Sequence, residues 1–272
     1  MRKFRAEILS ANMDGSRKVD LVRMLSVCLV LNDSSVLRGL RNSNANFIVV
    51  CYTYPLRRSN LHLSVKRITV SRRCKSKRVE LEELLFHAVE ATLQEWDEKG
   101  TAIIYCPTVH RVNALKRWLK GRDWSVAAYT GKMSQQDRLK AQEAFVNGSI
   151  KVIAATNAFG LGINKADVRL VIHAGLPLTL GGYVQEIGRA GRDGKKSKCI
   201  LFYSDTEFQR NKRILMQSGS EDAVRNGLEG SNAMKELLDS SECLWSQFER
   251  YYGQKVGRAC GHCCRCKEKA TR

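Results

Sequence analysis

Two arginines in the segment QEIGRAGRDG, which runs from Gln185 to Gly194, have the chemistry to bind an anion. Arg189 and Arg192 stand three residues apart among glycines, and a guanidinium group can donate two parallel hydrogen bonds to phosphate oxygens. The carboxylates of Glu186 and Asp193 are near enough in sequence to form surface salt bridges with them instead. The segment is therefore either a complete phosphate site or one half of a site whose other half lies elsewhere.

Four cysteines towards the end of the sequence have the spacing of metal ligands. Cys260, Cys263 and Cys266 are separated by two residues each, and Cys243 lies upstream in a stretch that we expect to be helical. Four thiolates complete a closed tetrahedral Zn²⁺ site of the structural type. His262 and Cys264 are close enough in sequence to replace one of the four. The spacing predicts a structural zinc site.

Three further segments have residues that suit phosphate binding, and each follows a short apolar run. A hydroxyl group or a glycine ahead of a helix can present free backbone amides to a phosphate. Each segment is weak evidence alone, but the three together predict one phosphate-binding edge. Their residues are Thr108 after the run 101–106, Thr130, Gly131 and Lys132 after 125–129, and Thr156, Gly160 and Lys165 after 150–155.

The elements that would position these residues alternate between strands and helices. Apolar strands are expected at 101–106, 125–129, 150–155, 168–173 and 198–203, with helices at 79–96, 108–120 and 134–148 between or before them. Continuously apolar strands separated by amphipathic helices predict an α/β domain whose parallel sheet carries helices on both faces. The loops that do chemistry leave the carboxyl ends of such strands. The glycine–arginine segment is expected in the helix before the last strand, and helices follow residue 205.

Four blocks of sequence, in this order and spacing, resemble the second RecA-like lobe of RecQ-family ATP-dependent DNA helicases. They are AIIYCPT, AAYTGKM, ATNAFGLGINKADVRLVIHAGLP and YVQEIGRAGRDG, and the likeness is close over 100–203 and looser towards the C-terminus. The resemblance implies a RecA-like parallel sheet followed by a small helical zinc-binding domain with Cys243, Cys260, Cys263 and Cys266 as ligands. The domains expected are an inter-lobe remnant and basic linker at 1–78, the lobe at 79–204 and the zinc-binding domain at 205–272.

The resemblance also implies a role for each matching residue. Gln185, Arg189 and Arg192 would face ATP bound to the other lobe, with Arg192 as the arginine finger and Arg189 beside it. Thr156 and Gly160 would belong to the loop that couples nucleotide state to the DNA backbone, with Gly160 as a nucleotide contact. The residues implied along the DNA backbone are Thr108, Arg111, Thr130, Gly131, Lys132, Thr156 and Lys165. Val109 stands where the family often has an arginine, so this chain departs there from the family's set of phosphate contacts, although Arg111 remains.

The motifs of the first helicase lobe are missing from the sequence. No G-x-x-x-x-G-K-[ST] loop and no acidic box for Mg²⁺ is present. SRKVDLVRML resembles the last helix of that lobe, and LRNSNANFIVV resembles a degraded form of the strand that enters the second lobe, without the usual Arg-Pro-Asn. We therefore expect the C-terminal half of a 3′–5′ DNA helicase that uses ATP and Mg²⁺ only with a complementary first lobe and is inactive alone. The alternative is a stand-alone DNA-binding module without motor activity.

The charge of the chain favours a polyanion as partner. Its 46 Lys and Arg against 27 Asp and Glu give a net charge of +19, which points to nucleic acid first and an anionic membrane surface second. The resemblance implies single-stranded and partly duplex DNA as the partner. The stretch 57–79 has nine basic and no acidic residues and is interpreted as a solvated basic loop, with a non-specific DNA footprint as the alternative. No apolar run suggests a membrane span or a secretory signal. An intracellular protein is expected, nuclear if eukaryotic, with no membrane partner.

Overall fold

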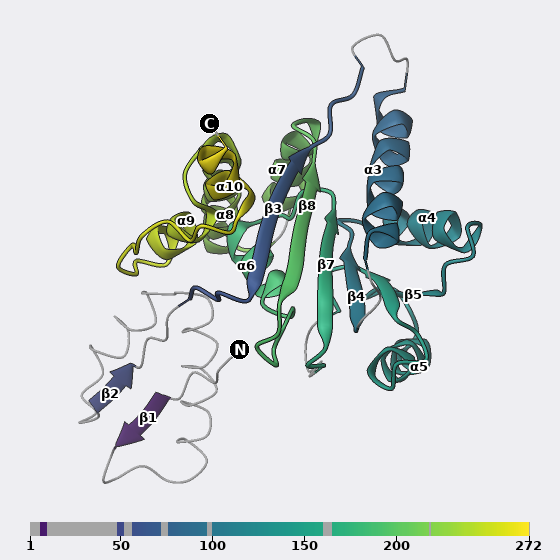
Figure 1. Cartoon of the computed structure of the whole chain (residues 1–272), viewed down its shortest axis with the longest axis horizontal. Coiled ribbons are helices and arrows are strands. Elements are labelled where there is room, and N and C mark those ends of the chain that lie inside the picture. Colours follow the sequence, from purple (N-terminus) through teal and green to yellow (C-terminus); the bar gives the residue numbers. More distant parts are fainter. Residues whose placement is uncertain are drawn as a thin grey trace.

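The computed structural model describes residues 56–71, 76–96, 100–159, 165–217 and 219–271, together with the backbone of two short strands at 6–9 and 48–51. Its centre is a six-stranded sheet with the order β3-β8-β7-β4-β6-β5, in which every neighbouring pair is parallel (Figure 1). The strands are β3 (Leu61–Arg67), β4 (Thr101–Tyr105), β5 (Val126–Tyr129), β6 (Val152–Ala155), β7 (Val168–Ala174) and β8 (Ser197–Tyr203). The predicted parallel α/β sheet is confirmed.

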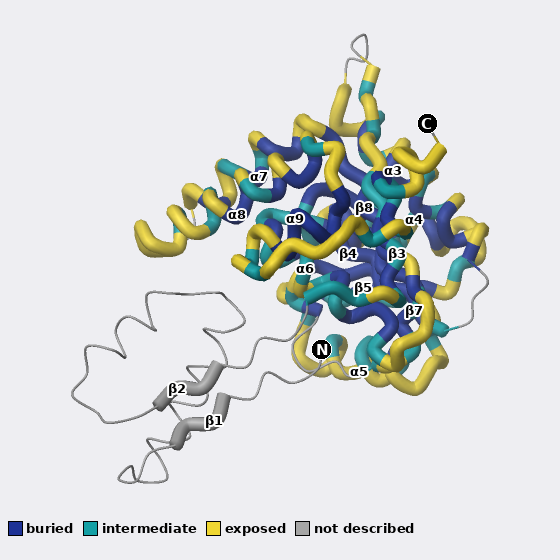
Figure 2. The backbone as a smooth tube through the Cα atoms, turned by 60° about the vertical axis from the view of Figure 1, so that its left-hand side comes forward, coloured by how far each residue is buried: buried dark blue, intermediate teal, exposed yellow. Residues whose placement is uncertain are grey.

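Helices cover both faces of this sheet, as predicted. Four helices connect its strands: α3 (Lys77–Gln94), α4 (Val109–Lys120), α5 (Gln135–Val146) and α6 (Leu180–Ile187). Alternate residues of β4 divide between two buried clusters: Ile104 packs with residues of α3 and α4, whereas Tyr105 packs with residues of α5 and α6. The inner part of the sheet is accordingly dark blue in Figure 2, where β4, β6, β7 and β8 are mostly buried. Strands buried on both sides need continuous apolar runs.

Strand β3 comes from the stretch interpreted from the sequence as a solvated basic loop, and that interpretation is wrong for residues 61–67. β3 lies at the edge of the sheet and pairs in parallel with β8, from Leu61 opposite Ser197 to Arg67 opposite Tyr203. Leu61 and Leu63 are buried, whereas the last residues of the strand are exposed. An edge strand that alternates buried and partly exposed residues lacks the continuous apolar run by which its neighbours were recognised.

The strand that enters the sheet was also expected in the wrong place. In the predicted segment 40–50, the last three residues belong to β2 (Ile48–Cys51), which pairs antiparallel with Ala6–Leu9 (β1) in a separate two-stranded sheet. The entering strand is β3, and the three residues before it are Arg58, Ser59 and Asn60. The helix expected around SRKVDLVRML lies outside the described residues.

The C-terminal helices share a core with one face of the sheet. They are α7 (Thr206–Met216), α8 (Glu221–Asp239), α9 (Leu244–Tyr251) and α10 (Cys264–Ala270), and α10 lies beside β3 (Figure 1). Phe248 of α9 stacks edge-on against Tyr183 of α6, with ring centroids 6.0 Å apart. A Cβ atom at Gly230 of α8 would lie 2.8 Å from the Cβ of Thr179, which caps the start of α6. Only glycine therefore allows α8 to approach the start of α6 so closely. None of the helices in the described ranges has the length and apolar character needed to cross a membrane.

Candidate functional site

The loops at the carboxyl ends of β4, β5 and β6 are joined by backbone hydrogen bonds. The amide of Cys106 donates to the carbonyl of Ala155 at 2.8 Å, and the amide of Thr156 donates to the carbonyl of Tyr129 at 3.1 Å. A Cβ built on Gly131 would lie 3.8 Å from the Cβ of Ala158, an ordinary contact between the second and third loops. The three loops expected to carry phosphate-binding residues therefore form one continuous edge, which we call the carboxyl edge.

The predicted phosphate-binding residues on this edge differ in exposure. Thr108 is half-buried and caps α4, because its hydroxyl oxygen accepts the amide of Arg111 at 3.2 Å. Gly131 and Lys132 are exposed ahead of α5, whose own cap is Ser134. Thr130 and Thr156 are buried, with 2% and 9% of their surface exposed. The amino ends of α4 and α5 thus both open towards the carboxyl edge, where their free amides favour an anion.

Two basic residues predicted to contact DNA are engaged elsewhere. Arg111 is 4% exposed, and its Nη1 donates to Glu207 at 2.7 Å and to the carbonyl of Ala174 at 3.1 Å. The ammonium of Lys165 donates to the carbonyl of Val146 at 3.0 Å and lies 3.2 Å from Asp167. We therefore leave Arg111 and Lys165 out of the proposed DNA interface.

The residues Gly188–Gly194, which we call the arginine turn, follow α6 instead of continuing it. Gly188 caps the helix, and the amide of Gly191 donates to the carbonyl of Val168 at the start of β7 at 2.8 Å. The expectation that Arg189 and Arg192 lie in the helix before β8 is therefore wrong, because the chain turns at these glycines. Gln185 lies within α6 and is exposed. Gly160, the remaining predicted nucleotide contact, lies outside the described residues.

A third arginine, Arg58, lies against the arginine turn and was not identified from the sequence. Its guanidinium donates to the carbonyls of Gly188, at 3.2 Å, and Gly191. Burial lowers the pKa of Arg192, and the positive charges of Arg189 and Arg58 lower it further. Three guanidinium groups therefore repel one another at one place, and an anion bound there would relieve that repulsion.

The two carboxylates beside the arginines in sequence bind other groups. Glu186 Oε2 lies 2.8 Å from Nε2 of His173, and Asp193 accepts from Arg169 and, at 3.1 Å, from the amide of Lys195. Both carboxylates thus have hydrogen-bond partners other than Arg189 and Arg192.

Tyr105 connects the arginine turn with the carboxyl edge. Its hydroxyl donates to the carbonyl of Phe159, in the loop after β6, at 2.9 Å and also hydrogen-bonds to the guanidinium of Arg189. Burial raises the pKa of Tyr105 well above its usual range, so the hydroxyl keeps its proton and remains a donor. The tyrosine looks like an ordinary core residue in the strand TAIIY, and no sequence signal distinguished it.

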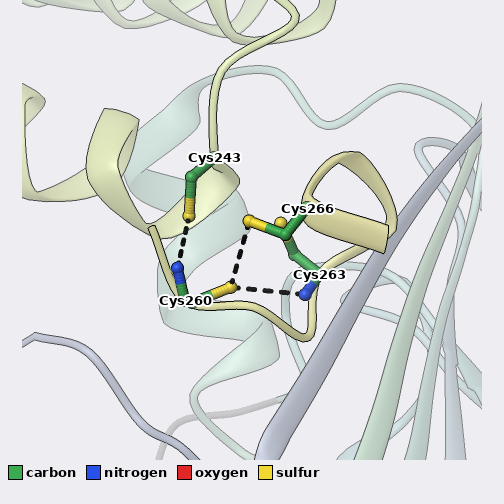
Figure 3. A group of neighbouring side chains, drawn as sticks. All are labelled: Cys243, Cys260, Cys263 and Cys266. Carbon is green, nitrogen blue, oxygen red and sulfur yellow. Dashed lines mark hydrogen bonds between the residues drawn. The ribbon is translucent and has the colours of Figure 1, made fainter. Parts of the chain in front are cut away.

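The four predicted metal ligands come together beside α9. Their sulfur atoms all lie within 4.8 Å of one another, and Cys260 Sγ is 3.8 Å from Cys266 Sγ (Figure 3). Around a tetrahedral ion with metal–sulfur bonds of about 2.3 Å, two sulfur atoms are separated by about 3.8 Å. Cys243 is the residue that caps α9, and Cys263 is the one that caps α10, so two helix starts hold the cluster. The geometry fits a closed four-sulfur metal site.

Backbone amides point at these sulfurs as they do at thiolates. The amide of Cys260 donates to Cys243 Sγ and that of Cys263 to Cys260 Sγ, each at 3.3 Å. Although burial opposes ionisation, hydrogen bonds from Cys260 and Ser246 lower the pKa of Cys243 to about 6. The two substitutes considered from the sequence are not in the cluster: His262 Nδ1 binds the carbonyl of Cys260 at 2.7 Å, and Cys264 contacts the backbone of Val65.

Comparison with known proteins shows which proteins this chain is similar to. Residues 77–194 match the helicase conserved C-terminal domain. The chain is 33% identical over 166 residues to the ATP-dependent DNA helicase RecQ of Bacillus subtilis (strain 168), covering 61% of this chain and 28% of that protein. It is 34% identical over 203 residues to the bifunctional 3'-5' exonuclease/ATP-dependent helicase WRN of Mus musculus, and the match covers 73% of this chain and 14% of that protein. The chain is 35% identical over 168 residues to the RecQ-like DNA helicase BLM of Xenopus laevis, and the match covers 59% of this chain and 12% of that protein.

The chain thus spans less than a third of the length of each of these relatives. The match covers the parallel sheet from α3 to the arginine turn, and therefore the carboxyl edge as well. These findings agree with the six-stranded parallel sheet and with the order of the motifs along it. This chain contains a helicase conserved C-terminal domain and, over that region, is a homologue of the RecQ helicases.

Proposed function

We propose that this chain supplies the second RecA-like lobe of a RecQ-type 3′–5′ DNA helicase and acts on ATP and Mg²⁺ held by a complementary first lobe. The observation that carries the proposal is the arginine turn. Arg189 and Arg192 lie together with Arg58, while the neighbouring carboxylates bind other groups. Phosphoryl transfer develops charge on phosphate oxygens, and an arginine supplied from a second lobe stabilises it. Arg192 is the proposed finger, Arg189 its neighbour, and Gln185 a nucleotide contact.

The carboxyl edge is the proposed grip on single-stranded DNA. Thr108, Gly131 and Lys132 present a hydroxyl, a close backbone and a positive charge at the amino ends of two helices. Such contacts bind the phosphate backbone irrespective of base sequence. Thr130 and Thr156 are proposed to shape the loops that carry these contacts, since both residues are buried and their backbone groups bond within the loops.

Zn²⁺ is the proposed metal of the four-cysteine cluster, with a structural role. A closed set of four thiolates leaves no coordination position for a reacting water, and it would tie the start of α9 to the segment 260–266. The cluster is continuous with the core that packs against α6, the helix that leads into the arginine turn.

A DNA-binding measurement tests the proposed grip. We expect a fluorescein-labelled 20-nucleotide oligo(dT) to bind with an affinity that falls with salt concentration, followed by fluorescence anisotropy. Lys132→Ala should weaken binding and reduce the slope of log K against log salt by about 0.7, the value for one phosphate contact on a single strand. Lys120→Ala is the matched control, because Lys120 is exposed at the opposite end of α4. Equal effects of the two substitutions would contradict a specific grip at the carboxyl edge.

An ATPase measurement separates the motor lobe from a stand-alone binding module. We expect no DNA-stimulated ATP hydrolysis by the chain alone, and hydrolysis when a first lobe carrying a P-loop, such as that of the Bacillus subtilis relative, is supplied. Arg192→Ala should then reduce turnover by about 10³-fold or more. DNA binding without any ATPase activity in the mixture would favour the stand-alone module. Turnover by the chain alone that disappears in Arg192→Ala would overturn the need for a second lobe.

A further inference from the structure

Glu207, in the first turn of α7, is a buried carboxylate at which three separate segments meet. It is 3% exposed, and both of its oxygens are occupied. Oε1 accepts from Arg111 of α4 at 2.7 Å and from Arg210 at 3.1 Å. Oε2 accepts the amides of Leu176, in the loop after β7, at 3.0 Å and of Ser204, after β8, at 3.3 Å. One side chain thus joins helix α4, two strand ends and helix α7.

The loop after β7 is built around this contact. Gly175 has φ +120°, and a Cβ there would lie 2.2 Å from Arg111 Nη1 and 2.9 Å from Glu207 Oε1. Asn211, one turn further along α7, donates to the carbonyls of Leu176 at 3.1 Å and Pro177 at 2.9 Å. Glycine is therefore required at position 175 for Arg111 and Glu207 to meet across the loop. Glu207 and Asn211 of α7 bind the backbone amide and carbonyls of the loop.

Arg111 transmits this anchor to the proposed DNA grip. Its backbone amide is the group that Thr108 caps, so Thr108 and the buried guanidinium belong to the same first turn of α4. Its Nη1 also donates to the carbonyl of Ala174 at 3.1 Å, and its Nε lies 3.9 Å from Glu82 of α3. A buried ion pair contributes little to net stability when compared with apolar packing, which makes a positioning role the better explanation of its presence.

We infer that Glu207 is a positioning residue for DNA binding, which holds Thr108 and the loop after β7 in place through Arg111 and Leu176. The inference rests on the proposed function, because it concerns the same carboxyl edge. The inference predicts that loss of either partner of the Glu207–Arg111 ion pair weakens DNA binding. Removal of the negative charge of Glu207 should therefore weaken the binding of a polyanion. A purely electrostatic effect has the opposite sign, since loss of an acidic charge strengthens attraction to DNA.

The test compares Glu207→Gln with Glu83→Gln, in which the same charge is removed from an exposed position of α3. Affinity for labelled oligo(dT) is measured by anisotropy at a temperature where circular dichroism shows each variant to be folded. We expect Glu207→Gln to bind about tenfold more weakly, the effect of one or two lost phosphate contacts, and Glu83→Gln to bind at least as tightly as the parent. Unchanged or tighter binding by folded Glu207→Gln overturns the inference.

Two further variants keep the test decisive. Arg111→Lys retains the positive charge but cannot reach Glu207 and Ala174 with the same planar group, and it should weaken binding as Glu207→Gln does. If either of these variants is unfolded, Asn211→Ala releases the carbonyls of Leu176 and Pro177 without a change of charge and should again weaken binding. Failure of the parent chain to bind the oligonucleotide contradicts the proposed function. Binding that depends on Lys132 but not on Glu207, Arg111 or Asn211 contradicts this inference alone.

Discussion

The side-chain amide of Asn60 donates a 2.9 Å hydrogen bond to the carbonyl oxygen of Gly191, which lies 131 positions later in the chain. The same amide donates to the carbonyl of Lys195 at 2.9 Å, and the carbonyl of Asn60 accepts the amide of Ser197 at 2.9 Å. The residue before the edge strand therefore holds the turn that carries Arg189 and Arg192. The position of the proposed arginine finger thus depends on a segment that lies outside the region matched by the helicase domain.

Gly191 should tolerate no side chain, whereas Gly194, at the end of the same turn, should tolerate one at a lower cost. Gly191 has φ +53°, and a Cβ there would lie 2.5 Å from Asn60 Nδ2 and 2.7 Å from the carbonyl of Lys195. Gly194 has φ +82° but nothing within 4 Å. We expect Gly191→Ala to lower the free energy of unfolding by about 2–5 kcal/mol, from backbone strain plus overpacking, and Gly194→Ala by about 1–2 kcal/mol from strain alone. Urea denaturation measures both, and equal losses would contradict the packing of Gly191 against Asn60.

Asn60→Ala should loosen the arginine turn without affecting the far side of the sheet. The substitution leaves the carbonyl of Lys195 without this donor, and we expect a loss of about 1–3 kcal/mol in the free energy of unfolding. Amide hydrogen exchange should become faster over 188–197 and remain unchanged in α4. Asn113→Ala, at an exposed position within α4, is the control and should be neutral or slightly stabilising. Unchanged exchange across 188–197 in Asn60→Ala would show that Asn60 does not hold the turn.

The parts of this fold that could be predicted from sequence are those with one dominant signal. Strands β4, β6, β7 and β8 are buried apolar runs, and α5 is capped by Ser134, whose hydroxyl accepts the amide of Asp137 at 3.1 Å as its position in the sequence suggests. The four-cysteine cluster followed from ligand type and spacing. Each of these signals is local, so it can be recognised before the chain is folded.

The parts that were missed depend on contacts between distant segments. β3 is stabilised by β8 and by two buried leucines, in a stretch whose basic charge suggested a loop. From sequence, Arg111 at the start of α4 suits a phosphate contact as well as a buried anchor. Only its ion pair with Glu207, 96 positions later, distinguishes the two roles. The same holds for Arg58 and Tyr105, whose partners Gly188 and Arg189 lie far along the chain. Residue type alone carries no signal for such pairs.

The four-cysteine cluster should bind one zinc ion per chain and require it for local folding. Cys260→Ser removes one of four ligands, and we expect loss of the metal by elemental analysis together with loss of exchange protection over 243–271. Cys264→Ser is the control, because Cys264 contacts the backbone of Val65 and is not in the cluster, so it should retain the ion. A Cys260→Ser protein that keeps its protection over 243–271 without bound zinc would contradict a structural role for the metal.

Stability should fall above about pH 9, in part because of the thiol of Cys199. Burial raises the pKa of Cys199 to about 12, whereas in the unfolded chain the thiol ionises near its ordinary value of 9.0. Its contribution is therefore complete below pH 9 and is lost as the pH rises towards 12, since the unfolded state releases a proton that the folded state keeps. Between pH 9 and 10, Cys199→Ala should flatten the decline of the unfolding free energy by up to about 1.4 kcal/mol per pH unit. Chemical denaturation at several pH values, with reductant present, measures both slopes, and the cluster cysteines contribute equally to each protein. Identical slopes would contradict a raised pKa of the Cys199 thiol, which lies fully buried in β8 between β7 and β3.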